Sequence, residues 1–189
     1  MSAQDSKLFV ISGPSGAGKG TLVTRVRERR SNLGLTVSAT TRAPRKGEVD
    51  GVNYFFLTRE EFDRRVANGE FVEWAEVHGN CYGTLVSEVQ SKLASGSSLI
   101  LEIDVQGALQ VKERFPEAVL IFIKPPSLEV LRERLVGRGT ETPETIELRM
   151  ANAAHELALA DRYDDVVVND DLDCATDELV RVLDMHERI

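Results

Sequence analysis

The sequence has few cysteines and no long apolar run. Its two cysteines, Cys81 and Cys174, are too few for a disulfide framework and lack the spacing of metal ligands. No segment approaches the roughly 20 apolar residues that a membrane-spanning helix needs. The polar residues 1–7 and the short apolar run after them do not resemble a secretory signal. We therefore expect reduced thiols, a cytoplasmic location and no membrane partner.

An excess of positive charge is also absent. The formal net charge is −8 and the pI is about 5.0, so the chain as a whole has no attraction for polyanions. We expect no nucleic-acid partner, and any phosphate site must come from a local basic cluster. With 189 residues, 42% hydrophobic and 29% charged, the composition is that of a globular protein. This length predicts a single domain over residues 1–189.

Short apolar, β-branched runs recur along the chain and are typical of buried strands. They lie at residues 8–11, 35–37, 99–101, 119–123 and 166–168. Helical spacing follows the first run at Leu22 and Val26, and follows the fourth at Leu128, Leu131 and Leu135. This alternation predicts an α/β fold, a three-layer core in which helices cover a parallel sheet.

Two segments depart from this alternation. Residues 54–57 and 71–74 resemble strands separated by one short helix over 60–67, which Thr58 and Glu61 begin as a capping box. We expect a partly antiparallel lobe inserted at about 38–85 into a core of residues 1–37 and 86–189. The polar, glycine-flanked stretch 137–142 precedes a helix with Thr142 as its N-cap and a proline next. It predicts a mobile loop within a lid at about 134–150.

A glycine-rich segment lies between the first strand and the first helix. It reads Gly13-Pro14-Ser15-Gly16-Ala17-Gly18-Lys19-Gly20-Thr21. Glycines let backbone N–H groups turn toward an anion, and the helix N-terminus adds its positive dipole end. Lys19 would reach the β- and γ-phosphates. The alternative is a glycine-rich turn that only caps a helix, but the strand, the lysine and the helix together favour an ATP-binding loop.

The residue after Lys19 departs from the usual pattern. A serine or threonine normally stands there and its hydroxyl holds Mg²⁺, whereas this chain has Gly20 and then Thr21. Either Thr21 or water must therefore supply the ligand.

Two arginines, Arg42 and Arg45, lie three residues apart in a proline-bearing stretch of an otherwise acidic chain. Guanidinium forks suit phosphate, so the pair could clamp a monophosphate. A solvated basic loop is the alternative, and these residues alone slightly favour it. Tyr54 and Tyr82 are as compatible with core or turn positions as with phosphate contacts.

Glu73 lies in an apolar strand, where a buried carboxylate needs donors. The guanine edge offers N1–H and N2–H₂ side by side, and adenine lacks this pair. Hydroxyls of Ser38 and Thr84 could donate to the guanine O6. The alternative places Glu73 on the solvent face of a half-buried strand.

In combination these residues resemble the guanylate kinase family, over residue 9 to about 173. The resemblance rests on the Gly13–Lys19 loop, on residues 38–54 with their Thr-Arg-Ala-Pro-Arg and Gly-Glu motifs, and on residues 73–75, 82–84, 104–107, 137–139 and 168–170. Thr84 keeps the hydroxyl where the family often has serine. The resemblance implies a P-loop kinase fold with an inserted GMP-binding lobe and a lid, and phosphoryl transfer from ATP to GMP with Mg²⁺.

The resemblance also implies roles for individual residues. The guanine site would be lined by Ser38, Glu73, Thr84 and Asp104, with Glu102 nearby, and the GMP phosphate would be held by Arg42, Arg45, Tyr54 and Tyr82. The ATP phosphates would lie on residues Gly13, Pro14, Ser15, Gly16, Ala17, Gly18, Lys19, Gly20 and Thr21. Lid arginines would be Arg134, Arg138 and Arg149, and Asn169 would border the adenine. Catalysis would depend on Lys19, Arg42, Arg138 and Arg149.

Two other functions compete with this interpretation. Guanylate-kinase-like domains also serve as noncatalytic protein-binding modules, but such a module needs neither Lys19 nor the lid arginines. A kinase for another phosphorylated small molecule would keep Lys19 but lose the guanine pocket that Glu73 and Ser38 suggest. Homo-oligomerisation is not readable from the sequence, because apolar interface positions look like core.

Overall fold

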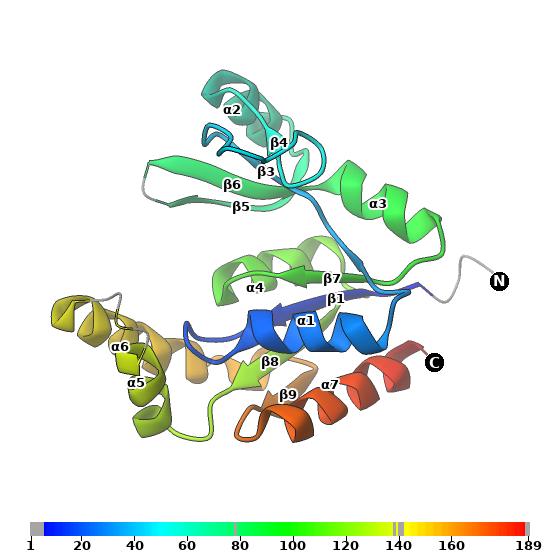
Figure 1. The fold of residues 1–189 in the computed structure, drawn as a ribbon. Coiled ribbons are helices and arrows are strands. Elements are labelled where there is room, and N and C mark those ends of the chain that lie inside the picture. The colour runs from blue at the N-terminus through cyan, green and yellow to red at the C-terminus, as the bar shows by residue number, and fades with distance from the viewer. Residues whose placement is uncertain (1–5, 78, 138, 140–141, 188–189) are drawn as a thin grey trace.

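Five strands lie side by side in one parallel sheet, in the order β2-β7-β1-β8-β9 (Figure 1). The computed structural model describes residues 6–77, 79–137, 139 and 142–187. The strands are β1 Leu8–Ser12, β2 Gly34–Leu35, β7 Leu99–Glu102, β8 Val119–Lys124 and β9 Asp165–Val168. β1 lies in the middle of the sheet, so the loop that follows it leaves from the centre of the carboxyl edge.

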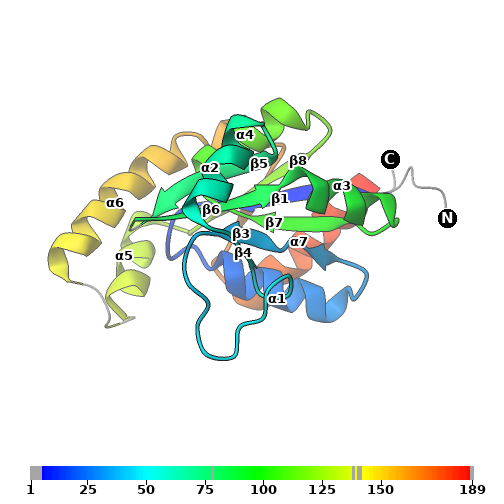
Figure 2. The same ribbon diagram turned by 90° about the horizontal axis from the view of Figure 1, so that it is seen from above.

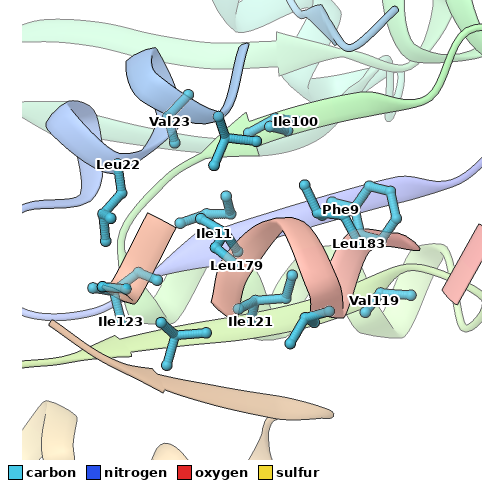
Figure 3. Close-up of a cluster of buried hydrophobic side chains, with 14 of the residues drawn as sticks. Phe9, Ile11, Leu22, Val23, Ile100, Val119, Ile121, Ile123, Leu179 and Leu183 are labelled. Atoms are coloured by element: carbon cyan, nitrogen blue, oxygen red, sulfur yellow. The ribbon is translucent and has the colours of Figure 1, made fainter. Parts of the chain in front are cut away.

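Helices cover both faces of this sheet because the side chains of β1 alternate between them. Phe9 and Ile11 point to one face and belong to a cluster with Leu22, Leu179 and other apolar residues (Figure 3). Leu8 and Val10 belong to a second cluster on the opposite face. The covering helices are α1 Lys19–Arg29 and α7 Leu172–Glu187 on the first face, and α3 Val86–Ala94 and α4 Val105–Arg114 on the second. The three-layer α/β core is confirmed.

A second sheet of four strands, ordered β4-β3-β6-β5, is formed by the segment between β2 and α3. Its strands are β3 Ser38–Thr40, β4 Phe55–Phe56, β5 Phe71–Val77 and β6 Asn80–Leu85, and α2 Arg59–Ala67 packs on it. β6 pairs antiparallel with both β3 and β5, whereas β3 and β4 are parallel. Phe62 stacks on Phe71 in a small separate core. Figure 1 shows this lobe beyond the edge of the five-stranded sheet where β7 lies, and Figure 2 shows the lobe above the strands when the molecule is seen from that edge.

The chain leaves the first sheet earlier than the sequence predicts. The strand expected at 35–37 ends at Leu35, and Ser38, one position beyond that expected strand, begins a strand of the second sheet. Side chains of α3 hold this crossing, since Glu88 accepts from the Val37 backbone N–H at 3.0 Å and Lys92 donates to Leu35 O at 2.6 Å. The β4 strand is likewise shorter than expected, because only Phe55 and Phe56 pair with β3.

The two remaining long helices, α5 Leu128–Gly137 and α6 Pro143–Leu157, lie beside the end of the sheet where the loop after β1 emerges (Figure 1). Thr142 caps α6 and Thr58 caps α2, as the sequence predicts. A short 3₁₀ turn, Ala160–Arg162, leads from α6 toward β9. Of the loop expected to be mobile, residues 138, 140 and 141 lie outside the described ranges. No helix among the described residues is long and apolar enough to cross a membrane.

Candidate active site

The glycine-rich loop joins β1 to α1 and lies close to other parts of the backbone. Gly13 has φ 140° and Gly18 has φ 92°, values that L side chains rarely adopt. A Cβ on Gly13 would overlap Ile123 O, and one on Gly18 would overlap the Asn169 amide. These two positions therefore require glycine both for their backbone angles and for their neighbours.

Lys19 begins α1 and turns back over the loop. Its Nζ donates to Gly13 O at 2.5 Å and to Pro14 O at 3.2 Å. Gly18 is the N-cap of α1 and brings no side chain to the helix end. The ammonium group and the first N–H groups of the helix thus lie at the same end of the loop, which suits an anion.

Asn169 ties the far end of the sheet to the loop. It follows β9, is only 5% exposed, and its Nδ2 donates to Ala17 O at 2.8 Å. Arg134 of α5 in turn donates to Asn169 O at 2.9 Å. Arg149 of α6 donates to the hydroxyl of Ser15. Asn169 and Arg149 therefore contact the loop directly and Arg134 is joined to it through Asn169, whereas Arg138 lies outside the described residues.

Gly20, which stands where the usual metal-binding pattern has a serine or threonine, lies in the first turn of α1. A Cβ on Gly20 would lie 3.6 and 3.7 Å from the two carboxylate oxygens of Glu102. Surrounding protein atoms raise the pKa of Glu102, and the charge of Lys19 partly offsets this. Thr21 is exposed, on the next position of the helix. Position 20, rather than position 21, therefore points toward Glu102.

A cationic and aromatic cluster occupies the loop between β3 and β4. Both Nη atoms of Arg42 donate to the carboxylate of Glu48, at 3.0 and 2.9 Å. The Arg42 guanidinium carbon lies 5.4 Å from the ring centroid of Tyr54, and the rings of Tyr54 and Tyr82 are 6.3 Å apart. The Arg45 backbone N–H also donates to Glu48, at 2.7 Å, and the Arg45 side chain is exposed.

Glu73, Thr84 and Ser38 occupy neighbouring strands of the second sheet in register. Thr84 pairs with Ser38 on one side and with Glu73 on the other. Burial raises the pKa of Glu73, the nearby Thr84 hydroxyl lowers it in part, and the charge of Asp104 raises it further. Thr84 Oγ1 is buried and makes no hydrogen bond of regular geometry with the described residues. The Glu73 carboxylate and the Thr84 hydroxyl therefore lie together with hydrogen-bonding capacity for a ligand.

Asp104 reaches this group from the other sheet. It caps α4 by accepting from the Gly107 N–H at 2.7 Å. A Cβ on Gly107 would lie 3.5 Å from an oxygen of Asp104 and 3.5 Å from an oxygen of Glu73, so the two carboxylates face one glycine. Asp104 also lines a pocket of about 350 Å³ with Glu156 and other residues of α6.

Glu48 is a site residue for which the sequence pattern predicts no role of its own. It neutralises the arginine expected to hold a phosphate and also accepts from the Arg45 backbone. The signal was present, since an acid stands three residues after Arg45 and six after Arg42. Glu156 was also missed, because nothing in its helix distinguishes it from a surface glutamate.

The geometry thus presents a phosphate loop on one sheet and a cation, carboxylate and hydroxyl group on the other. The family model described as guanylate kinase matches residues 5–186. The chain belongs to the guanylate kinase family. A relative from Gloeobacter violaceus named guanylate kinase is 57% identical over 178 residues, which cover 94% of this chain and 87% of the relative.

Two further members of the family agree over nearly the full length. A guanylate kinase from Halalkalibacterium halodurans is 52% identical over 183 residues, covering 97% of this chain and 90% of that protein. The crystal structure of guanylate kinase from Anaplasma phagocytophilum superposes with a TM-score of 0.72 at 37% identity, covering 96% of this chain and 86% of that one. The P-loop kinase fold is therefore confirmed.

Proposed function

We propose that this member of the guanylate kinase family transfers the γ-phosphoryl group of ATP to GMP, giving ADP and GDP. The observation that carries the choice of GMP is the half-buried carboxylate of Glu73 beside the Thr84 hydroxyl, in register with Ser38. A carboxylate in a poorly solvated place is stabilised by a pair of donors. The N1–H and N2–H₂ of guanine are such a pair, and Ser38 and Thr84 are donors for its O6.

The ATP phosphates would occupy the loop formed by residues 13–21. Its backbone conformation and the N-terminus of α1 favour an anion, and Lys19 lies at the same end. Asn169 holds the Ala17 carbonyl and borders the loop, which supports its place next to the adenine. Arg134 acts on the same edge through its bond to Asn169 O.

The GMP phosphate would lie on the cluster of Arg42, Tyr54 and Tyr82, with Arg45 at its exposed rim. Arg42 offers a planar fork of donors, and its position between Glu48 and the Tyr54 ring limits the orientations it can adopt. Asp104 would complete the guanine contacts from the other sheet, because it shares the Gly107 surface with Glu73. Glu102 would lie between the two nucleotides.

In the transfer step an oxygen of the GMP phosphate forms a bond to the γ-phosphorus as the bond from that phosphorus to the β–γ bridging oxygen breaks. The bridging oxygen leaves with ADP, and the attacking oxygen is already anionic, so no general base is required. The barrier is repulsion between two anions, which Lys19, Arg42, Arg138 and Arg149 would reduce. Closure of the region 134–150 would exclude water and limit hydrolysis of ATP.

Mg²⁺ would be the cofactor and would supply positive charge to the ATP phosphates. Oxygen donors suited to such an ion are present at this helix end, because Glu102 offers a carboxylate beside Gly20, and the Thr21 hydroxyl on the next position of α1 is an alternative ligand. Mg²⁺ prefers oxygen ligands and keeps several waters in kinase sites. The described residues hold no group of three acidic, histidine or cysteine ligands that could bind a metal without the nucleotide.

The same assignment gives each segment of the chain a role. Residues 1–37 and 86–189 would form the ATP-binding core, residues 38–85 the GMP-binding lobe and residues 134–150 the lid. A cytoplasmic location and the absence of nucleic-acid partners stay predictions from composition, and homo-oligomerisation stays open.

The test is ADP release by the purified full chain with Mg²⁺ and ATP, with GMP, AMP, UMP or a sugar phosphate as acceptor in turn. We expect release with GMP to exceed that with every other acceptor by about 10²-fold or more, given the cost of leaving a buried polar site unpaired. Equal rates with all acceptors would remove the guanine assignment. Loss of all activity would favour a noncatalytic binding module.

A further inference from the structure

Ser15 is the only residue of the loop between Gly13 and Lys19 whose side chain carries a hydroxyl. Its Oγ accepts a hydrogen bond from Nη1 of Arg149, which lies 134 residues later in α6. Both side chains are half-buried, so water screens the contact only in part. The phosphate loop and the α6 arginine are therefore joined by a direct side-chain contact.

The helix pair that carries Arg149 is itself joined to the loop. Leu131 and Leu135 of α5 form a cluster with Ala153 of α6, and Met150 packs against it. A Cβ on Gly16 would lie 2.9 Å from Leu131 Cδ1 and 3.1 Å from Leu135 Cδ2, so the loop lies directly on this cluster. Arg132 of α5 also pairs with Glu147 of α6. The α5–α6 pair therefore contacts the loop through apolar packing at Gly16 and through a hydrogen bond at Ser15.

We propose that Ser15 is a positioning residue for Arg149. It holds the guanidinium over the phosphate loop while further N–H groups of Arg149 meet the transferring phosphates. The inference rests on the proposed function of Arg149 in phosphoryl transfer. It assigns the Ser15 side chain a role separate from the backbone N–H groups of the loop.

Two properties of the pair support this arrangement. A guanidinium carries five N–H donors in a rigid plane, so a bond to the Ser15 hydroxyl is compatible with further bonds to phosphate oxygens. An arginine side chain also loses rotamer freedom when it is fixed at a site, and a bond to Ser15 restricts the orientations that this long side chain can adopt. The apolar packing of α5 and α6 at Gly16 places the helix that carries Arg149. The bond to Ser15 then selects one orientation of the Arg149 side chain.

The experiment is a double-mutant cycle with Ser15→Ala, Arg149→Ala and the double variant, together with Ser15→Thr as the conservative variant. Each full-length protein is assayed for GMP-dependent ADP release at varied ATP and saturating GMP. Melting temperatures are compared to exclude misfolding. A hydrogen bond of this kind has a net value that corresponds to about 3–10-fold in kcat/KM for ATP.

We expect Ser15→Ala to lower kcat/KM for ATP by about 3–10-fold in the parent protein and by less than about twofold in the Arg149→Ala background. We expect Ser15→Thr to stay within about twofold of the parent, because it retains the hydroxyl. The same loss in both backgrounds would overturn the inference, since Ser15 would then act on the loop and not through Arg149. An unchanged or raised kcat/KM in Ser15→Ala would overturn it as well.

Failure of the proposed function is distinguishable from failure of this inference. If the parent protein shows no GMP-dependent ADP release, the proposed function is wrong. If the parent is active and the cycle shows no coupling between Ser15 and Arg149, only the positioning role is wrong.

Discussion

Arg42 and Glu48 form a two-bond pair in which both Nη atoms of the arginine contact the same carboxylate, at 3.0 and 2.9 Å. Their side chains are only 15% and 20% exposed. The hydrogen bonds from Arg42 hold the pKa of Glu48 below its usual range, and the Arg45 backbone N–H contributes in the same direction. A lowered pKa means that this pair stabilises the fold above the ordinary glutamate range and is lost only as pH falls through the lowered value.

The pair predicts that Glu48 positions Arg42 for the GMP phosphate. Glu48→Ala removes both bonds and frees the guanidinium, so KM for GMP should rise about 10-fold or more while KM for ATP stays within about twofold. Glu60→Ala is the matched control, because Glu60 is an exposed glutamate of the same lobe. A lowered KM for GMP in Glu48→Ala would instead mean that the carboxylate competes with the substrate phosphate.

The ionised Glu73 is expected to lower the stability of the fold and to strengthen the binding of GMP. Because burial raises its pKa, the ionised carboxylate destabilises the nucleotide-free protein at neutral pH. Glu73→Gln should therefore raise Tm by about 1–4 °C and lower kcat/KM for GMP by about 10²-fold, with KM for ATP nearly unchanged.

The exposed Glu76 on the same strand offers the comparison, since Glu76→Gln should leave the GMP kinetics near those of the parent. In the parent, kcat/KM for GMP should fall on acidification with an apparent pKa above that of an ordinary glutamate, because the protonated carboxyl loses an acceptor. Equal weakening of GMP and ATP by Glu73→Gln would show that Glu73 does not contact the base.

The first turn of α1 predicts a specific metal dependence. Gly20 has no hydroxyl to bind Mg²⁺, and the Thr21 hydroxyl is the candidate replacement. Thr21→Val should then raise the Mg²⁺ concentration for half-maximal activity about 10-fold. Gly20→Ser should restore it in the Thr21→Val background, because a Cβ at position 20 has ordinary contact distances of 3.6 and 3.7 Å to Glu102. An unchanged Mg²⁺ dependence in Thr21→Val would assign the ligand to water.

The contact between Gly18 and Asn169 predicts an unusually costly glycine substitution. Gly18→Ala combines a positive φ of 92° with a Cβ that overlaps the Asn169 amide. Gly96 has a comparable φ of 82°, and no atom of the described residues lies within 4 Å of an added Cβ, so Gly96→Ala isolates the backbone strain. We expect a loss of about 1 kcal/mol for Gly96→Ala and about 3 kcal/mol for Gly18→Ala in urea unfolding. Similar losses would mean that Asn169 moves aside freely.

Local features of the sequence predicted much of this structure. The loop after β1 was readable because its glycines, Lys19 and the flanking strand are contiguous, and the Thr58 and Thr142 caps were readable for the same reason. The position of Ser38 was not, because its place in a second sheet depends on pairing with Thr84, 46 positions further along the chain. A strand assigned from local pattern alone does not reveal which sheet it joins.

Contacts between distant residues account for the rest. Asn169 bonds to Ala17 across 152 positions and Arg149 to Ser15 across 134, so no sequence spacing signals either pair. Glu48 lies near its partner in sequence, but an acid among exposed loop residues is usually solvated. Only the folded loop identifies it as the group that orients Arg42.

The fate of a labelled γ-phosphoryl group shows whether the protein transfers it from ATP to GMP. With Mg²⁺, the full chain should convert GMP to β-labelled GDP, with one ADP formed for each GDP. Lys19→Ala should reduce this rate by about 10³-fold or more, because positive charge on the transferring group is lost. Label appearing as inorganic phosphate, or undiminished transfer by Lys19→Ala, would contradict the account.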